Sequence, residues 1–599
     1  MKPLGICKTI STPNGHPSLM GRMPTGEWAP LHSLNDPLQE AERLISHHDF
    51  LGEDITILMG FGLGYLPLAI LKRMHPEHFL VIVEACPEII LNACRTMDLS
   101  PVFANKRVHI FTADQIKPIW ELLEKEQLKL LAGRVNKLIH PPSRLQFPDA
   151  YHIVENKVEA FVTMQEESFK ALEAQRNLTA ENVLKNMVSI LHASAADLLF
   201  KSLKGYPALV IAAGPSLDKN ISNIRTFKDR ALLIAVDTAL KPLAAEGITP
   251  DMVVSVDPSA ANLKKITSIP RASLDQIPLI FSPHVRHEIP SHFHGPKFVF
   301  GMPNSLIRWA LSHLGEVKEL PYGFSVAHYA FYLAREMEAD PIIFVGLDLA
   351  FTHYRAHAKN CSNIWSADLK RPDIVFVPGI EGVAVPSFPG FAKMITLFEK
   401  EIKNTKARCI DATEGGAFIE GTSVMTLEDA RELCAYNNIP LTQRQIREIW
   451  HKHRLADCRH IKSGLKWLLD EADDLYQLSQ RAMKLLSPVL KLLDQKAPLE
   501  TDASRIFEEI NEISDQVNLH RTFLNVIRDQ MGKVFIEQYK LKFQLEREIE
   551  EAERLRLGVY KSHIFFERLI QIVDKIRCFG TAAIRQLETT LETKDISLS

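Results

Sequence analysis

The segment ALVIAAGPSLD (residues 208–218) joins a short apolar strand to a glycine turn and the start of a helix. Gly214 allows a tight strand-to-helix turn, and Pro215 fixes φ at the start of the next element. Ser216 is expected to cap the helix, so that free backbone N–H groups remain available for a phosphate. Taken alone, the turn fits a phosphate site and an ordinary capped helix equally well.

Further short, apolar strands are predicted downstream, with helix-like stretches between most of them. They lie at 231–237, 251–257, 278–282, 297–301 and 341–348. The alternation predicts a doubly wound parallel sheet, which we place in a central α/β domain at 176–432.

A second α/β domain, Rossmann-like, is predicted at 1–175. Residues 55–71 (ITILMGFGLGYLPLAIL) predict a buried strand, a glycine turn and a helix, and residues 79–97 repeat strand, acid and helix. Residues 107–114 predict a third strand. Continuous apolar strands alternating with helices are typical of a parallel sheet that is covered on both faces.

The glycine turn at 60–65 is a candidate nucleotide site. Gly60, Gly62 and Gly64 let the backbone approach a ligand, and Glu84 at the end of the next strand could accept from ribose hydroxyls. The turn also resembles that of adenosylmethionine-dependent methyltransferases. The favoured alternative is close packing of strand and helix without a cofactor.

The C-terminal region changes character after about residue 432. Strand-like runs stop, Gly and Pro become rare, and 461–494 places apolar residues at helical spacing. We predict an all-helical domain at 433–599.

Composition excludes several classes of protein. The 599 residues are 46% hydrophobic and 24% charged, and a formal net charge of −3 provides no general basic field for nucleic acid. No apolar run reaches the length of a membrane span, and the start does not read as a signal peptide. Eight cysteines without a CxxC pair favour a reducing cytoplasm.

Four blocks, in this order, resemble the motility-associated factor (Maf) family of flagellin glycosyltransferases. They are YPALVIAAGPSLDKNI (206–221), LLIAVDTALKPLAAEGITPDMVVSVDP (232–258), YGFSVAHYAFYLAREMEADPIIFVGLDLAFTHYRAHAKN (322–360) and CIDATEGGAFIEGTSVMTLEDA (409–430). The family's central domain is similar to bacterial sialyltransferases of GT-A-like fold and to archaeal hydroxymethylpterin pyrophosphokinases. The resemblance implies transfer of a pseudaminic, legionaminic or sialic type of nonulosonic acid from its CMP ester to Ser/Thr of flagellin or another acceptor.

The resemblance also implies a set of donor-binding residues. The turn of Gly214, Pro215, Ser216 and Leu217 would lie against the donor nucleotide, and Asp237 or Thr238 would help to hold it. Gly323 and Ser325 would contact the donor sugar, with Ser325 capping a helix beside the sugar carboxylate; Phe324 departs from the family's usual glycine. Asp257 either joins the donor site or forms a turn.

The catalytic candidates follow the strand at 341–348. His357 lies nine residues after Asp348, where the resemblance implies a histidine, and it is the predicted base for the acceptor hydroxyl because the pKa of histidine lies near working pH. Asp348 would orient that base or bind ribose, although it could instead brace the loop. His353 and Tyr354 compete with His357 for the role.

Metal binding is not required by this interpretation, although a divalent ion is compatible with it. His284, His287, His292 and His294 have a spacing that could supply imidazole ligands, but the Pro-rich segment around them disfavours a metal site. The glycines of Glu414-Gly415-Gly416 are expected to be structural. Alternative functions are an ATP-dependent pyrophosphokinase, a methyltransferase acting through the 60–65 turn, and a non-enzymatic flagellin-binding or motility accessory protein.

Overall fold

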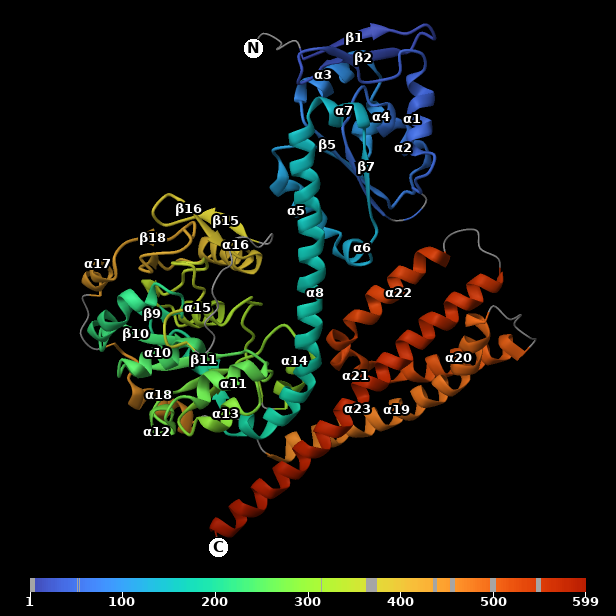
Figure 1. Cartoon of the computed structure of the whole chain (residues 1–599). Coiled ribbons are helices and arrows are strands. Elements are labelled where there is room, and N and C mark those ends of the chain that lie inside the picture. Colours follow the sequence, from blue (N-terminus) through green and yellow to red (C-terminus); the bar gives the residue numbers. More distant parts are fainter. Residues whose placement is uncertain are drawn as a thin grey trace. The chain divides into compact units, whose positions relative to one another are not determined.

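The computed structural model describes residues 6–50, 52, 54–313, 315–361, 374–434, 439–452, 458–495, 502–545 and 551–598. The chain forms two compact units (Figure 1). The first contains residues 1–172, 485–507 and 532–565, and the second contains 173–484, 508–531 and 566–599. Each unit thus combines an α/β part with helical segments from the C-terminal region. The division into three domains at 175 and 432 stays a prediction.

The first unit is built on a four-stranded parallel sheet of order β6-β5-β4-β7. Alternate side chains of each strand enter two different cores, as the pleat requires. Leu58 and Ile82 pack among residues of α1 to α4, whereas Ile57 and Val81 pack against α5, α6 and α8. The sheet is therefore covered on both faces, as expected for parallel strands.

The elements of the first unit begin with a three-stranded antiparallel sheet, β1-β2-β3. In chain order the elements are β1 (Cys7–Ser11), β2 (Pro17–Arg22), β3 (Trp28–Pro30), α1 (Pro37–Ile45), β4 (Ile55–Met59), α2 (Tyr65–Arg73), β5 (Phe79–Glu84), α3 (Pro87–Thr96), α4 (Ser100–Ala104), β6 (Val108–Thr112), α5 (Ile116–Lys125), α6 (Gln127–Leu131), β7 (Val135–Ile139) and α7 (Pro141–Gln146). Helix α8 (Pro148–Leu191) belongs to this unit up to Leu172 and to the second unit from Glu173.

The second unit contains a nine-stranded sheet of order β18-β17-β14-β9-β10-β11-β12-β13-β8. All of its neighbouring strands are parallel. Its strands are β8 (Ser194–Ala195), β9 (Ala208–Ile211), β10 (Leu232–Val236), β11 (Met252–Ser255), β12 (Leu279–Phe281), β13 (Lys297–Val299), β14 (Ile342–Val345), β17 (Cys409–Asp411) and β18 (Ser423–Val424). The predicted fold class, two parallel-sheet α/β parts and a helical C-terminal region, is confirmed.

The topological switch point of this sheet lies between β9 and β14. From β9 the order runs through β10 to β13 on one side and through β14, β17 and β18 on the other. Ligands of open α/β sheets bind outside the carboxyl ends of the strands at such a point. The two loops that meet there follow β9 and β14, and they carry the glycine turn and Asp348.

The remaining elements of the second unit surround this sheet or continue into the helical region. They are η1 (Ala196–Leu199), α9 (Leu217–Asn220), η2 (Ile221–Phe227), η3 (Asp237–Ala239), α10 (Leu240–Ala245), α11 (Ala260–Thr267), α12 (Arg271–Leu274), α13 (Ile289–His292), α14 (Ser305–Ser312), α15 (Val326–Glu336), β15 (Val375–Pro378), β16 (Ala384–Ser387), α16 (Pro389–Lys403), α17 (Leu427–Glu432), α18 (Gln443–Lys452), α21 (Arg521–Val526) and η4 (Arg528–Met531).

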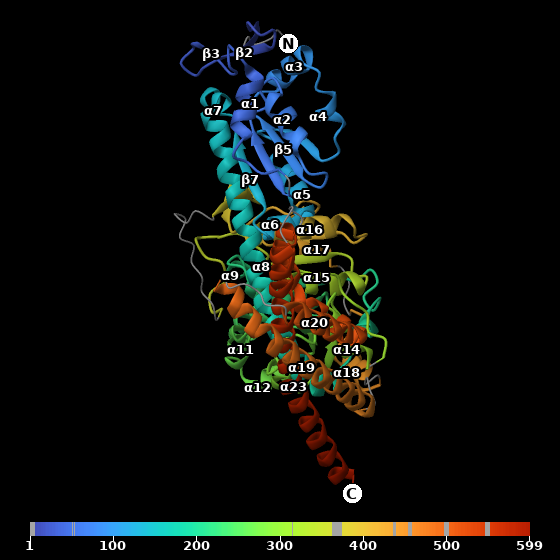
Figure 2. The ribbon, with the colours of Figure 1, turned by 90° about the vertical axis from the view of Figure 1, so that its right-hand side faces the viewer.

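Long helices dominate the C-terminal region. They are α19 (Cys458–Asp494), α20 (Asp502–Leu519), α22 (Gly532–Leu545) and α23 (Glu551–Leu598). Within the second unit α19 and α23 lie side by side, where Arg577 pairs with Asp473 and a Cβ at Gly580 would meet Leu469 (Figures 1 and 2). None of the helices in the described ranges is long and apolar enough to cross a membrane.

Helix α8 is also tied to two loops at the carboxyl edge of the nine-stranded sheet. The buried amide of Asn182 donates to the carbonyl of Pro258, which follows β11. The amide of Asn186 donates to the carbonyls of Pro283 and Val285, which follow β12, at 2.8 Å each. These loops are therefore held by side chains of a neighbouring helix.

Candidate functional site

The turn after β9 needs glycine because another segment approaches its backbone closely. The N–H of Gly214 donates to the carbonyl of Gly346 at 2.7 Å, which joins the ends of β9 and β14. A Cβ at Gly214 would lie 2.6 Å from that carbonyl oxygen and 2.7 Å from Cγ of Asp348. The residue therefore makes room for the loop after β14, beyond any effect on the local turn.

Asp348 holds this turn. Its carboxylate accepts from the backbone N–H of Ser216 at 3.1 Å, from the Ser216 hydroxyl at 2.6 Å and from the Thr352 hydroxyl at 2.6 Å. The side chain is almost fully buried, and burial raises its pKa although these hydrogen bonds oppose the shift. Asp348 thus acts on the turn directly, and no described contact links it to His357.

The predicted cap at Ser216 is wrong. Helix α9 has four residues, and the Ser216 side chain makes no capping hydrogen bond. Its hydroxyl and its N–H both point to Asp348 instead, because that buried carboxylate needs donors. Contact of Gly214, Pro215, Ser216 and Leu217 with a donor nucleotide stays a prediction.

The Glu414-Gly415-Gly416 segment closes over the same carboxylate. Gly416 has φ +82°, a Cβ there would lie 2.8 Å from the carbonyl carbon of Asp348, and the Ala417 N–H donates to the Asp348 carbonyl. Glu414 accepts from the Leu427 N–H at the start of α17 and pairs with Lys219 at 2.7 Å. Partial burial raises the pKa of Glu414, but these two donors lower it overall. Gly416 thus packs against the backbone of Asp348, in line with the structural role expected for the glycines.

A second buried acid, Asp411, lies at the end of β17, next to β14 in the sheet. Its Oδ1 accepts from the Thr413 N–H, whereas its Oδ2 is buried without a hydrogen-bond partner. Burial first, and the charge of Asp348 in addition, raise the pKa of Asp411 to about 6 against the opposing Thr413 hydrogen bonds. Sequence reasoning missed Asp411, although its place at a strand end was a usable signal.

Asp237 and Asp257 follow the neighbouring strands β10 and β11 and are brought together by Lys265. The Lys265 ammonium lies 3.6 Å from Oδ1 of Asp237 and 3.7 Å from Oδ2 of Asp257. Asp237 is fully buried and also accepts from the hydroxyls of Ser255 and Thr238. Burial by itself lowers the pKa of Lys265, but the two carboxylates raise it overall. Sequence reasoning missed Lys265.

His357 contacts the turn after β9 and is within electrostatic range of Lys265. It hydrogen-bonds the backbone of Ala213, and the following Ala358 N–H donates to the Ala213 carbonyl at 2.9 Å. Burial lowers the pKa of His357, the positive charge of Lys265 lowers it further, and the Ala213 hydrogen bond opposes both. The imidazole is therefore held in the neutral form that a base requires.

The loop carrying His357 has an unusual backbone. Leu349, His353, Tyr354 and Asn360 all have positive φ, which L-residues adopt rarely. Asp218 fixes the loop by accepting from the Arg355 side chain at 2.9 Å and from the Lys359 N–H at 2.8 Å. Tyr354, a competing candidate, is 62% exposed, whereas His357 is partly buried.

Gly323 and Ser325 precede α15. Because the chain runs from the end of α15 to the start of β14, the first turn of α15 lies toward the carboxyl edge of the nine-stranded sheet. The predicted side-chain cap at Ser325 is wrong. Its hydroxyl is 2.8 Å from Nδ1 of His328, and the Gly323 N–H donates to the Tyr329 hydroxyl. Burial lowers the pKa of His328 to about 3. No described contact joins Gly323 or Ser325 to the Asp348 or Lys265 groups.

The four histidines after β12 have separate partners. His284 is 3.1 Å from the Ser282 hydroxyl, His287 contacts Asn182, His292 contacts the Glu288 carbonyl, and His294 contacts Asp275. Among the described residues, no three His, Cys, Asp or Glu side chains are arranged to hold a metal ion.

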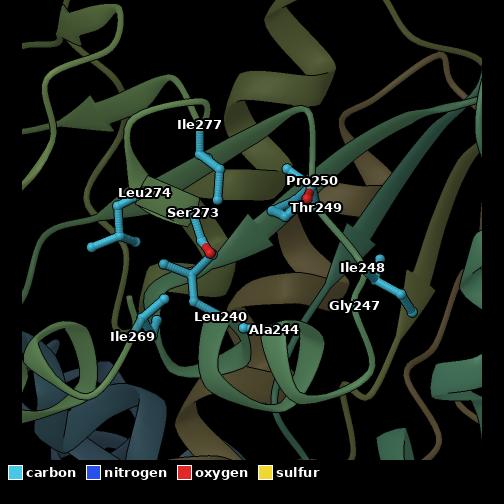
Figure 3. Close-up of a pocket in the computed structure, with 10 residues that line it drawn as sticks. All are labelled: Leu240, Ala244, Gly247, Ile248, Thr249, Pro250, Ile269, Ser273, Leu274 and Ile277. Carbon is cyan, nitrogen blue, oxygen red and sulfur yellow. The ribbon is translucent and has the colours of Figure 1, made fainter. Parts of the chain in front are cut away.

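A pocket in the second unit lies away from these groups. Its lining includes Leu240, Ile248, Ile269, Leu274 and Ile277, which precede or flank the starts of β11 and β12 (Figure 3). The ligand edge of a parallel sheet is the opposite one. We therefore assign this aliphatic pocket no part in the candidate site.

The 60–65 turn of the first unit is filled by protein side chains. Glu84 accepts from the Phe61 N–H at 2.7 Å, and Nε2 of His32 accepts from the Leu63 N–H at 2.8 Å. A Cβ at Gly60 would lie 2.8 Å from Cβ of His140. The glycines allow this close packing, in line with the favoured alternative, and the donors that a cofactor would use are already engaged.

The sequence of this chain is similar to one protein family and to two bacterial proteins. Residues 181–354 match the family described as 6-hydroxymethylpterin diphosphokinase MptE-like. Two uncharacterised proteins of Treponema pallidum (strain Nichols) are similar. One is 28% identical over 206 residues, covering 33% of this chain and 68% of the relative; the other is 41% identical over 51 residues, covering 8% and 24%.

A solved structure has the same fold over nearly the whole chain. It is a Maf glycosyltransferase from Magnetospirillum magneticum AMB-1, with a TM-score of 0.50, 15% identity, and coverage of 98% of this chain and 92% of that chain. Together with the MptE-like match, this confirms at the level of fold the resemblance inferred from the sequence.

Proposed function

We propose, from the shared fold and the geometry at the switch point, that this chain is a glycosyltransferase. Its donor would be a CMP-activated nonulosonic acid of the pseudaminic, legionaminic or sialic type. Its acceptor would be a Ser/Thr hydroxyl of flagellin or another protein. The four sequence blocks that resemble the Maf family support this choice of donor and acceptor.

The observation that carries the proposal is the position of His357. It contacts Ala213, next to the glycine turn, and its pKa is lowered by the charge of Lys265, which lies beside Asp237. A neutral imidazole at the carboxyl edge of a parallel sheet is suited to deprotonate an acceptor hydroxyl. The hydroxyl oxygen then bonds to the anomeric carbon of the sugar, the bond from that carbon to the phosphate oxygen breaks, and CMP leaves with the electron pair.

The other predicted residues divide between nucleotide and sugar in this proposal. Gly214, Pro215, Ser216 and Leu217 form the wall against the nucleotide, with Asp237, Thr238 and Asp257 beside it. Gly323 and Ser325 face the sugar. Asp348 positions the glycine turn, because its carboxylate is already hydrogen-bonded by the hydroxyls of Ser216 and Thr352.

A second candidate function is diphosphoryl transfer from ATP to a hydroxymethylpterin. The family match over residues 181–354 favours it. Such chemistry uses Mg²⁺, for which carboxylates are suitable ligands. Asp237 and Asp257, the two acids at adjacent strand ends, already share the ammonium of Lys265, which favours the glycosyltransferase.

Ligand-dependent thermal stability separates these candidates. Stabilisation by CMP, with no effect of ATP plus Mg²⁺ or adenosylmethionine, is expected. Incubation of the chain with a CMP-nonulosonic acid and unmodified flagellin should add the sugar mass to flagellin peptides. Stabilisation by ATP plus Mg²⁺ but not by CMP would refute the proposal and support the diphosphokinase.

A further inference from the structure

We propose that Lys265 binds the phosphate of the donor nucleotide. This inference rests on the proposed function and names a residue that the sequence did not single out. Lys265 lies on α11, directly after the β11 loop that carries Asp257. It is the cation of a group that includes acids from two adjacent strand ends.

The ammonium has hydrogen-bonding capacity that its neighbours do not use fully. A lysine has three N–H donors, and hydrogen bonds to oxygen are normally 2.7–3.2 Å long. The carboxylates of Asp237 and Asp257 lie beyond that range, at 3.6 and 3.7 Å.

Both carboxylates have closer donors of their own. Asp237 accepts from Ser255 at 2.7 Å, and Asp257 accepts from the Ser259 N–H at 2.9 Å. The two acids therefore hold the ammonium at ion-pair distance, and with two carboxylates for its three N–H donors, one donor remains for a ligand.

The position of Lys265 matches that of the leaving group in the proposed reaction. His357 is adjacent to the turn through Ala213 and is within the electrostatic reach of Lys265. A phosphate between the turn and Lys265 would thus lie next to the base. Charge that develops on the departing phosphate is stabilised best by a fixed cation in a buried setting, and only 12% of the Lys265 side chain is exposed.

The test compares binding of CMP and cytidine, which differ only by the phosphate. Isothermal titration calorimetry on the full chain would use Lys265→Gln, with Lys264→Gln as the matched control because Lys264 is exposed on the same helix. The preference of the wild type for CMP over cytidine should fall about tenfold or more in Lys265→Gln, the usual effect of losing a charged hydrogen bond. Affinity for cytidine should be unchanged, and Lys264→Gln should behave as the wild type.

The outcomes distinguish the two proposals. A folded Lys265→Gln variant with the wild-type preference for CMP overturns the role of Lys265 and leaves the proposed function standing. Failure of the wild type to bind CMP overturns the proposed function and the inference with it. If Lys265→Gln does not fold, Lys265→Met, which removes the charge but keeps a long unbranched side chain, decides by the same ratio of CMP to cytidine affinity.

Discussion

The buried carboxylate of Asp348 binds both the backbone N–H and the hydroxyl of Ser216, which lies 132 positions earlier in the chain. The two residues follow adjacent strands on either side of the switch point. Their contact joins the loops that border the candidate site.

Replacement of Gly214 by alanine should destabilise the second unit and abolish transfer. The added Cβ would meet the Gly346 carbonyl and the Asp348 carboxylate, both held by the backbone of the β14 loop. Overpacking of this kind costs about 1–3 kcal/mol. Chemical denaturation and a transfer assay would measure both effects.

Gly415→Ala is the matched control for that experiment. It lies in the same site, but its new Cβ would have only ordinary contacts, the nearest at 3.5 Å from Ser216. Equal loss of stability in the two variants would contradict the steric argument.

Asp411→Asn should stabilise the protein at neutral pH. The pKa of Asp411 is raised to about 6 in the fold, chiefly by burial. The contribution of Asp411 to the free energy of unfolding is therefore fully present below the pKa that Asp411 has in the unfolded chain. It is lost as the pH rises through about 6. Removal of the charge should add up to about 3 kcal/mol to the free energy of unfolding near pH 7.5, and the gain should vanish near pH 4.

Urea denaturation of both proteins across this pH range would measure the effect. A gain that is independent of pH would show that the side-chain amide, rather than the removal of charge, stabilises the variant.

Acid should destabilise the first unit through His140. Burial lowers the pKa of His140 to about 4, against an opposing hydrogen bond with the backbone of Leu31. The neutral form is thus favoured by the fold, and stability present above the unfolded pKa of about 6.5 should be lost as pH falls toward 4. Hydrogen exchange of the β4–α2 segment should accelerate in this window.

His140→Gln should weaken this acid sensitivity, with His75→Gln as the control. His75 is only partly buried and lies outside the glycine turn. An unchanged pH response in His140→Gln would assign the sensitivity to another group, of which His32, buried beside His140, is the nearest.

Lys265→Gln should move the acid limb of the rate–pH profile to higher pH. His357 must be neutral to act as a base, so the rate falls as pH drops through its pKa. Burial and then the Lys265 charge lower that pKa, and removal of the charge should raise it. If the acid limb of a folded, active Lys265→Gln variant lies at the same pH as in the wild type, His357 is not the base that titrates in this limb.

The sequence predicted β4 to β6 of the first parallel sheet and β9 to β14 of the second, because these strands are short runs rich in apolar residues. It did not reveal β7, whose apolar residues are interrupted by Asn136 and Lys137. It also missed β8 and β18, which have two residues each, and β17, which has only two apolar residues before Asp411.

Asp237, Thr238 and Asp257 were predicted separately as donor-binding candidates. The fold brings Asp237 and Asp257 together, because adjacent parallel strands end at the same edge.

The partners of these residues were harder to anticipate. Lys265 follows Lys264 in the sequence, and two adjacent lysines in a helix usually lie on a solvent-exposed face. Only the structure shows that the Lys265 side chain lies beside Asp237 and Asp257. Ser216 has the sequence context of a helix cap. Its actual partner, Asp348, comes from a strand that is adjacent in space but remote in sequence.

The amides of Asn182 and Asn186 have a thermodynamic consequence for ligand binding. By holding the carbonyls of Pro258, Pro283 and Val285, they fix the loops after β11 and β12 while the chain folds. Ordering a loop backbone opposes binding by about 1–2 kcal/mol per residue when it happens on association. Because the order here is already present, a nucleotide that reaches this edge should bind with little loss of conformational entropy.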